Sequence, residues 1–168
     1  MRALVGLRIA LVGPVPPPAG GMAMQTRQLA ELLEAAQARV TLVPTNAPYR
    51  PAFVGQWPGV RAVFRFVPYL AALWSATGRS ELVHVMANSG WSWHLFAAPA
   101  IWVARLRHLP VVVNYRGGEA ASFLEGGARW VRASMRLATR LVVPSVFLQH
   151  LFAIRKRVKQ MKAINAPS

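Results

Sequence analysis

The chain has 168 residues, the length of a single domain, and 54% of them are hydrophobic, which excludes an intrinsically disordered protein. It contains no cysteine, and this excludes disulfide frameworks, thiolate metal sites and cysteine nucleophiles. The formal net charge of +15 predicts a polyanionic or anionic-membrane partner.

The first elements in chain order are a strand, a glycine- and proline-rich loop and a helix. The apolar run 7–12 predicts a buried strand, and the spacing of apolar residues over 22–36 predicts a helix. The loop at 13–22 contains Gly20 and Gly21, which give a phosphate or a sugar access to the backbone N–H groups of a helix N-terminus. We expect this loop to bind a ligand, with a purely structural turn as the alternative. It is neither a G-x-G-x-x-G fingerprint nor a P-loop.

The rest of the chain alternates short apolar segments with segments of helical periodicity. Strands are expected at 40–43, 82–86, 111–115 and 141–143, and helices at 60–74, 91–107, 128–138 and from 144 onward. Strands that are continuous apolar runs separated by helices predict an α/β fold with a parallel sheet covered by helices on both faces. Ligands of such sheets bind beyond the carboxyl ends of the strands, where the loops 13–22 and 116–119 are expected.

The helix at 60–74 is expected to be amphipathic. Its predicted apolar side consists of Val60, Val63, Phe64, Val67, Leu70, Ala71 and Trp74. Arg61 and Arg65 are placed on the other side, and Pro68 is expected to kink or restart the helix. The apolar side has two interpretations, packing in the core and contact with lipid.

The most apolar stretch, residues 82–104, contains His84, Asn88, His94 and Pro99. A membrane-spanning helix needs about 20 mostly apolar residues, so we expect a strand, a loop and a core helix here instead. The N-terminal apolar run is interrupted by Arg8 and does not resemble a signal peptide. We therefore expect a cytoplasmic protein, with peripheral attachment to the inner face of the plasma membrane as an extension of this prediction.

The distribution of the basic residues narrows the choice of partner. Before residue 150 every cation is an arginine, and most stand singly among aromatic and aliphatic residues. This favours an anionic bilayer surface over a nucleic acid, which requires a contiguous basic stripe. All three lysines lie in the last 13 residues, at Lys156, Lys159 and Lys162. We therefore divide the chain into a domain at 1–152 and a basic tail at 153–168, which is either a solvated tail or the product of a frame change near His150.

Four segments together resemble the N-terminal domain of family 4 glycosyltransferases, the retaining enzymes of the GT-B fold. They are residues 8–22, with the loop described above, the strand at 81–85, the strand and loop at 111–119, and the strand-to-helix element at 141–148. The resemblance covers residues 7–152.

The resemblance implies one Rossmann-like half of a two-domain enzyme that transfers a sugar from a nucleotide-sugar donor to a lipid-linked or polysaccharide acceptor. By the same resemblance, Gly20 and Gly21 would lie against the donor diphosphate and sugar, and Arg116, Gly117 and Gly118 would line the cleft. Weaker cleft candidates are Met22, His84, Asn88, Glu119 and Ser145. The family's second, donor-binding domain is absent from this sequence, so we expect no turnover from this chain alone.

The residues themselves leave other readings open. Arg116 could instead be a solvated loop residue. His84 could be a histidine of the core, and Glu119 could be an acidic residue that stabilises a helix N-terminus. The sequence offers no carboxylate pair, Ser-His-Asp grouping or metal-ligand cluster, so we expect no metal and no cofactor other than the nucleotide-sugar substrate. The alternative function is a non-catalytic module that binds a membrane surface or another polyanion.

Overall fold

The computed structural model describes residues 4–48, 60–117 and 128–143, and the structural statements that follow concern these residues. Five parallel strands form one sheet in the order β2-β1-β3-β4-β5. The strands are β1 (Arg8–Gly13), β2 (Arg39–Pro44), β3 (Leu82–Ala87), β4 (Val111–Tyr115) and β5 (Arg140–Val142). The helices are α1 (Gly21–Ala35), α2 (Val60–Thr77), the π-helical turn η3 (Trp93–Ala97), α3 (Ala98–Leu106) and α5 (Ala128–Leu137).

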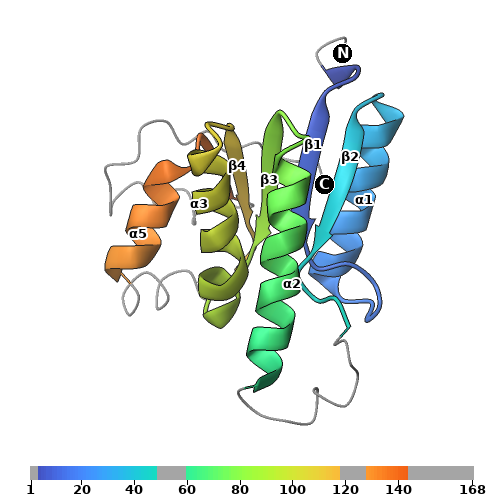
Figure 1. Cartoon of the computed structure of the whole chain (residues 1–168). Helices are drawn as coiled ribbons and strands as arrows, with labels where there is room; N and C mark the ends of the chain where they lie inside the picture. Colours follow the sequence, from blue (N-terminus) through green and yellow to red (C-terminus); the bar gives the residue numbers. More distant parts are fainter. Residues whose placement is uncertain (1–3, 49–59, 118–127, 144–168) are drawn as a thin grey trace.

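Helices cover the sheet on both faces, as predicted, and the fold is a Rossmann-like α/β fold. Figure 1 shows α1 behind β1 and β2, whereas α2 and α3 lie in front of the sheet and α5 lies beside α3. The distribution follows from right-handed crossovers, because the step from β1 to β2 runs in the opposite direction to the steps that lead to β3, β4 and β5.

The larger apolar core lies between the sheet and the α2/α3/α5 layer. Trp93 is fully buried there, and its indole Nε1 donates a hydrogen bond of 3.0 Å to Ser134 Oγ on α5. Tyr69 of α2 donates from its hydroxyl to the Phe96 carbonyl at 2.7 Å and stacks edge-on against the Phe96 ring. These bonds satisfy the polar atoms of large buried rings and fix α2 and α5 against the η3–α3 segment.

A smaller core lies under α1 and is built from small side chains. Ala23, Thr26 and Ala30 are the buried residues of α1, and Leu11 and Met86 face them from the sheet. Leu32 of the same helix is 63% exposed.

The orientation of α2 differs from the sequence prediction. Phe66, Tyr69, Leu70 and Leu73 contribute to the core, whereas the predicted apolar side is largely exposed. Its exposed members are Val63, Phe64, Val67 and Trp74, with exposed fractions of 58%, 41%, 57% and 53%. Arg65, predicted to point outward, is only partly exposed. The prediction was wrong because apolar residues occur all around this helix, so periodicity alone does not select the buried side.

Pro68 neither ends nor restarts α2, which runs without interruption from Val60 to Thr77. Proline has no N–H to donate to the carbonyl of Phe64, four residues earlier. Because Pro68 lies on an exposed part of the helix, solvent can reach the Phe64 carbonyl that lacks this hydrogen bond.

In the described part of the chain, no helix has both the length and the apolar character needed to cross a bilayer.

Gly13, at the carboxyl end of β1, is required by close packing between the sheet and α1. A Cβ atom placed there would lie 2.9 Å from Met86 Cβ and 2.9 Å from Thr26 Oγ1. Glycine therefore lets β1, β3 and α1 approach one another closely.

We expect Gly13→Ala to lower the free energy of unfolding by about 1–3 kcal/mol, because the added methyl group overpacks this contact. Urea denaturation measures the change. Gly21→Ala is the matched control, since no described atom lies within 4 Å of a Cβ at that position. Equal destabilisation by the two variants would contradict the packing argument.

Candidate functional site

The candidate site lies at the carboxyl edge of the sheet, where β1 and β3 are neighbours. The chain leaves β1 toward β2 and leaves β3 toward β4, so the two connections diverge from adjacent strands. Such a switch point opens a crevice in which open α/β sheets bind their ligands. The loops that bound it are the predicted proline-rich loop and the segment Asn88–Gly90.

Asn46, which follows β2, holds the proline-rich loop in place. Its Oδ1 accepts a hydrogen bond of 2.9 Å from the Val15 N–H. Its Nδ2 donates to the Val15 carbonyl at 2.7 Å and to the Pro17 carbonyl at 3.3 Å. One side chain therefore satisfies three backbone groups of a loop whose prolines supply few hydrogen bonds of their own.

Gly20 and Gly21 form the start of α1 and are both exposed. Gly20 has φ −113°, which any residue adopts, and no described atom lies within 4 Å of a Cβ added at either position. The described fold thus gives neither residue a steric reason to be glycine. The first turn of α1 has no side-chain cap and no acidic residue, so its N–H groups are available to an anion.

A second group of polar side chains comes from β3 and β4. His84 pairs with Leu11 of β1, and Asn114 pairs with Met86 of β3. Paired residues share a face of the sheet, so His84 and Asn114 lie on the face that α1 covers. Arg116 follows two residues after Asn114, and its Nε donates a hydrogen bond of 3.0 Å to Asn114 Oδ1. Asn114 is buried, with 7% exposure, and the hydrogen bond that it accepts orients the guanidinium group of Arg116.

His84 is neutral in this environment. Burial, together with the nearby positive charge of Arg116, lowers its pKa from 6.5 to about 4. Its Nε2 atom is buried and has no hydrogen-bond partner among the described residues. His84 is therefore a neutral group beside a cation.

Gly117 is buried between two polar side chains on the other face. Tyr115 Oη lies 3.3 Å from Ser89 Oγ, and a Cβ at Gly117 would collide with both residues. Gly117 therefore has a packing role that explains its identity without a ligand. Arg116 N–H donates to the Ala87 carbonyl at 2.8 Å, which extends the pairing of β3 and β4 by one residue.

The remaining predicted residues divide into two groups. Asn88 is exposed at the edge, and its Oδ1 accepts a hydrogen bond from the Ser89 N–H; Met22 packs against the small core beneath α1. Gly118, Glu119 and Ser145 lie outside the described residues. The loop after β1 and the loop after β4 share the carboxyl edge, separated by β3.

Sequence reasoning missed Asn46 and Asn114 as positioning residues. Asn46 follows a strand, and Asn114 interrupts the apolar run of β4 two residues before Arg116. A lone amide inside a buried strand was the available signal, because such a group requires a partner.

A hollow of about 340 Å³ lies beside the carboxyl end of β2, between Pro44 and residues of α2 that include Arg65 and Tyr69. Within the ranges given above, no group of three or more His, Asp or Glu side chains is arranged to hold a metal ion. Comparison with family models, with curated proteins and with solved structures gave no match for this chain.

We expect the stability of the protein to fall as the pH is lowered from about 6.5 to 4. Between these values the unfolded chain binds a proton at His84 that the folded chain does not, because burial lowers the folded-state pKa to about 4. The full contribution of about 3 kcal/mol is present above pH 6.5 and is lost by pH 4. Urea denaturation across this range measures it, and His84→Gln should show a flatter dependence. Identical pH profiles for the two proteins would contradict the assignment.

We expect Asn46→Ala to destabilise the protein by about 1–2 kcal/mol, because the Val15 and Pro17 backbone groups lose their partner. Asn88→Ala is the control, since that side chain accepts only a local hydrogen bond from Ser89. Hydrogen exchange of the Val15 amide is expected to accelerate in Asn46→Ala alone. Unchanged exchange would show that the loop is held by other contacts.

Proposed function

We propose that this chain is the acceptor-side N-terminal domain of a retaining glycosyltransferase of the GT-B fold, acting with a nucleotide-sugar donor. The lipid-linked or polysaccharide acceptor would occupy the same edge of the sheet. The proposal combines the sequence resemblance given above with the geometry of the carboxyl edge.

The observation that carries the proposal is the pair Gly20–Gly21. Both stand in open space with unstrained backbone at the uncapped start of a 15-residue helix. A glycine that the described fold does not require is explained by a ligand that approaches the backbone closely. The helix start favours an anion, and a diphosphate matches that preference.

Arg116 supplies the second contact of the proposed site. Its side chain is held by Asn114 on the same face of the sheet as α1, two strands away from β1. Neighbouring strands are about 4.8 Å apart, so the ends of β1 and β4 are separated by about 10 Å. A diphosphate joined to a sugar is long enough to extend across this distance, with the diphosphate at α1 and the transferred sugar toward Arg116.

The chemistry assigned to this domain is positioning and charge stabilisation. Backbone N–H groups at the start of α1 stabilise charge that develops on the leaving diphosphate. The guanidinium of Arg116 donates to sugar hydroxyls or phosphate oxygens. His84 carries no charge above its pKa of about 4, so the positive charge that these two residues offer the ligand is that of Arg116.

We expect Gly21→Ala to stabilise the fold by about 0.5–1 kcal/mol and at the same time to weaken ligand binding. Alanine is the better helix former, and its methyl group meets no described atom, but it occupies the space through which a diphosphate would approach. Titration of the isotope-labelled chain with UDP-glucose and GDP-mannose, followed by amide chemical shifts, measures binding at residues 20–23.

Gln28→Ala is the matched control, because Gln28 is an exposed residue of the same helix away from its N-terminus. Saturable shifts at 20–23 and at Arg116, reduced in Gly21→Ala and retained in Gln28→Ala, support the proposal. Absence of shifts with both nucleotide sugars and with pyrophosphate at millimolar concentration would contradict it.

A further inference from the structure

Exposed apolar side chains gather on the α2/α3/α5 side of the molecule, opposite α1 and away from the candidate site. Of the large hydrophobic side chains that are exposed among the described residues, eight belong to these three helices, whereas α1 contributes Met24 and Leu32. The most exposed of the eight are Leu106 at 72% and Trp130 at 71%. An apolar surface of this kind on one side of a protein marks a binding surface.

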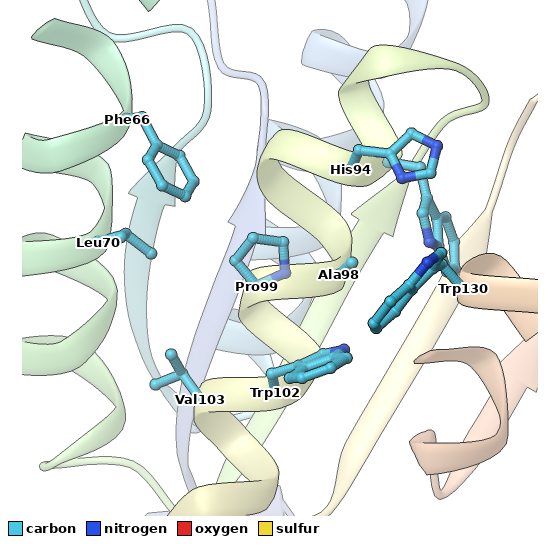
Figure 2. A pocket seen from close by; sticks show the side chains of 9 residues that line it. Phe66, Leu70, His94, Ala98, Pro99, Trp102, Val103 and Trp130 are labelled. Atoms are coloured by element: carbon cyan, nitrogen blue, oxygen red, sulfur yellow. The ribbon is translucent and has the colours of Figure 1, made fainter. Parts of the chain in front are cut away.

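This surface is hollowed between the helices. A cavity of about 440 Å³ is lined by Phe66 and Leu70 of α2, Pro99, Trp102 and Val103 of α3, and Trp130 of α5, among others. In Figure 2 the small side chains Ala98 and Pro99 lie between two groups of larger ones. Phe66 and Leu70 are on one side, and the indole rings of Trp102 and Trp130 are on the other. The Trp102 and Trp130 rings lie 6.3 Å apart between centroids. The volume falls within the range of pockets that hold organic ligands, about 300–1,000 Å³.

On the helices that line the hollow, the charged side chains that the structure describes are all arginines. Residues 60–77, 91–107 and 128–140 contain eight arginines and neither Asp nor Glu. Arg105 of α3 and Arg129, Arg132 and Arg136 of α5 are exposed beside the apolar surface. Among the described glutamates, Glu31 and Glu34 belong to α1 and Glu81 precedes β3.

We propose that the α2/α3/α5 surface binds an anionic phospholipid bilayer and that the hollow accepts an acyl chain of that bilayer. Tryptophan rings with an apolar body and a polar N–H favour the headgroup boundary, and arginines beside them attract anionic headgroups. The apolar stripe Val63, Val67 and Trp74 of α2 extends the contact along the surface of the protein. This binding is independent of the proposed sugar transfer, which uses the carboxyl edge of the sheet.

Charge distinguishes a bilayer from a second copy of the chain as the occupant. Two copies joined through this surface would bring the arginines of both α5 helices together without any acidic side chain of these helices between them. Like charges in contact are repulsive, whereas an anionic leaflet neutralises every one of them.

Sedimentation of the full chain with phospholipid vesicles tests the proposal. We expect binding to vesicles of phosphatidylcholine mixed with phosphatidylglycerol, no binding to phosphatidylcholine alone, and progressive loss of binding with added KCl. Trp130→Ser combined with Val67→Ser should weaken binding at least about tenfold, because two exposed apolar side chains no longer enter the bilayer. Arg129→Gln combined with Arg136→Gln should weaken it about thirtyfold.

Two double variants on the α1 and β2 side are the matched controls. Met24→Ser with Leu32→Ser removes exposed apolar side chains, and Arg27→Gln with Arg39→Gln removes the same charge, from the opposite side of the molecule. Both should bind nearly as the wild type does. Equal losses in the control and test variants, or no binding to anionic vesicles at low salt, would overturn the proposal. The proposal would also be overturned if the wild type binds no vesicle but forms a concentration-dependent dimer, and if Trp130→Ser with Val67→Ser abolishes that dimer.

A fluorescence measurement tests the hollow itself. Vesicles with brominated acyl chains should quench the tryptophan fluorescence of the bound wild type. Trp102→Phe with Trp130→Phe keeps the apolar surface and should still bind, but it should lose the part of the quenching that these two rings contribute, while Trp74 stays quenched. Quenching unchanged by this double substitution would place the acyl chains elsewhere and overturn the assignment of the hollow.

Discussion

The rest of the structure depends on one constraint of the sheet topology. The chain adds β2 on one side of β1 and then adds β3, β4 and β5 on the other side, so the direction of strand addition reverses between β1 and β3. Among the described helices, right-handed crossovers then place α1 on one face and α2, α3 and α5 on the other. The tight approach of Gly13 to Met86 and Thr26 keeps β1, β3 and α1 together at this point. The glycine pair at the start of α1 and the Asn114–Arg116 pair consequently share one face and one edge of the sheet.

In the described part of the chain, the two faces of the sheet differ in chemistry. The α1 face combines a small core with polar groups from β3 and β4, and α1 pairs Arg27 with Glu31 at 2.9 Å on its solvent side. The opposite face buries the large aromatic residues and exposes further ones beside the arginines of α3 and α5. This asymmetry separates the proposed sugar-nucleotide site from the proposed membrane surface, so each can be altered without the other.

Much of the fold was predictable from sequence, because buried parallel strands are short continuous apolar runs. The strand Val111–Tyr115 was placed without error, and the other strand ends differ by at most one residue from those expected. The buried side of α2 was not predictable, since its apolar residues occur all around the helix and only the packing of Tyr69 and Leu73 selects a side. The role of Asn46 was equally hidden, because its bonds reach a loop about 30 residues away in the chain.

The two ends of the described sheet have a consequence for self-association. β2 begins with Arg39, ends with Pro44 and exposes half of its residues, and β5 has three residues and begins with Arg140. An edge that carries a charge and a residue without an N–H group, or one that is very short, is a poor template for another strand. Neither described edge therefore favours growth of the sheet into a larger intermolecular one. The backbone is protected against aggregation by strand addition, although the protein exposes an unusually apolar surface on its helices.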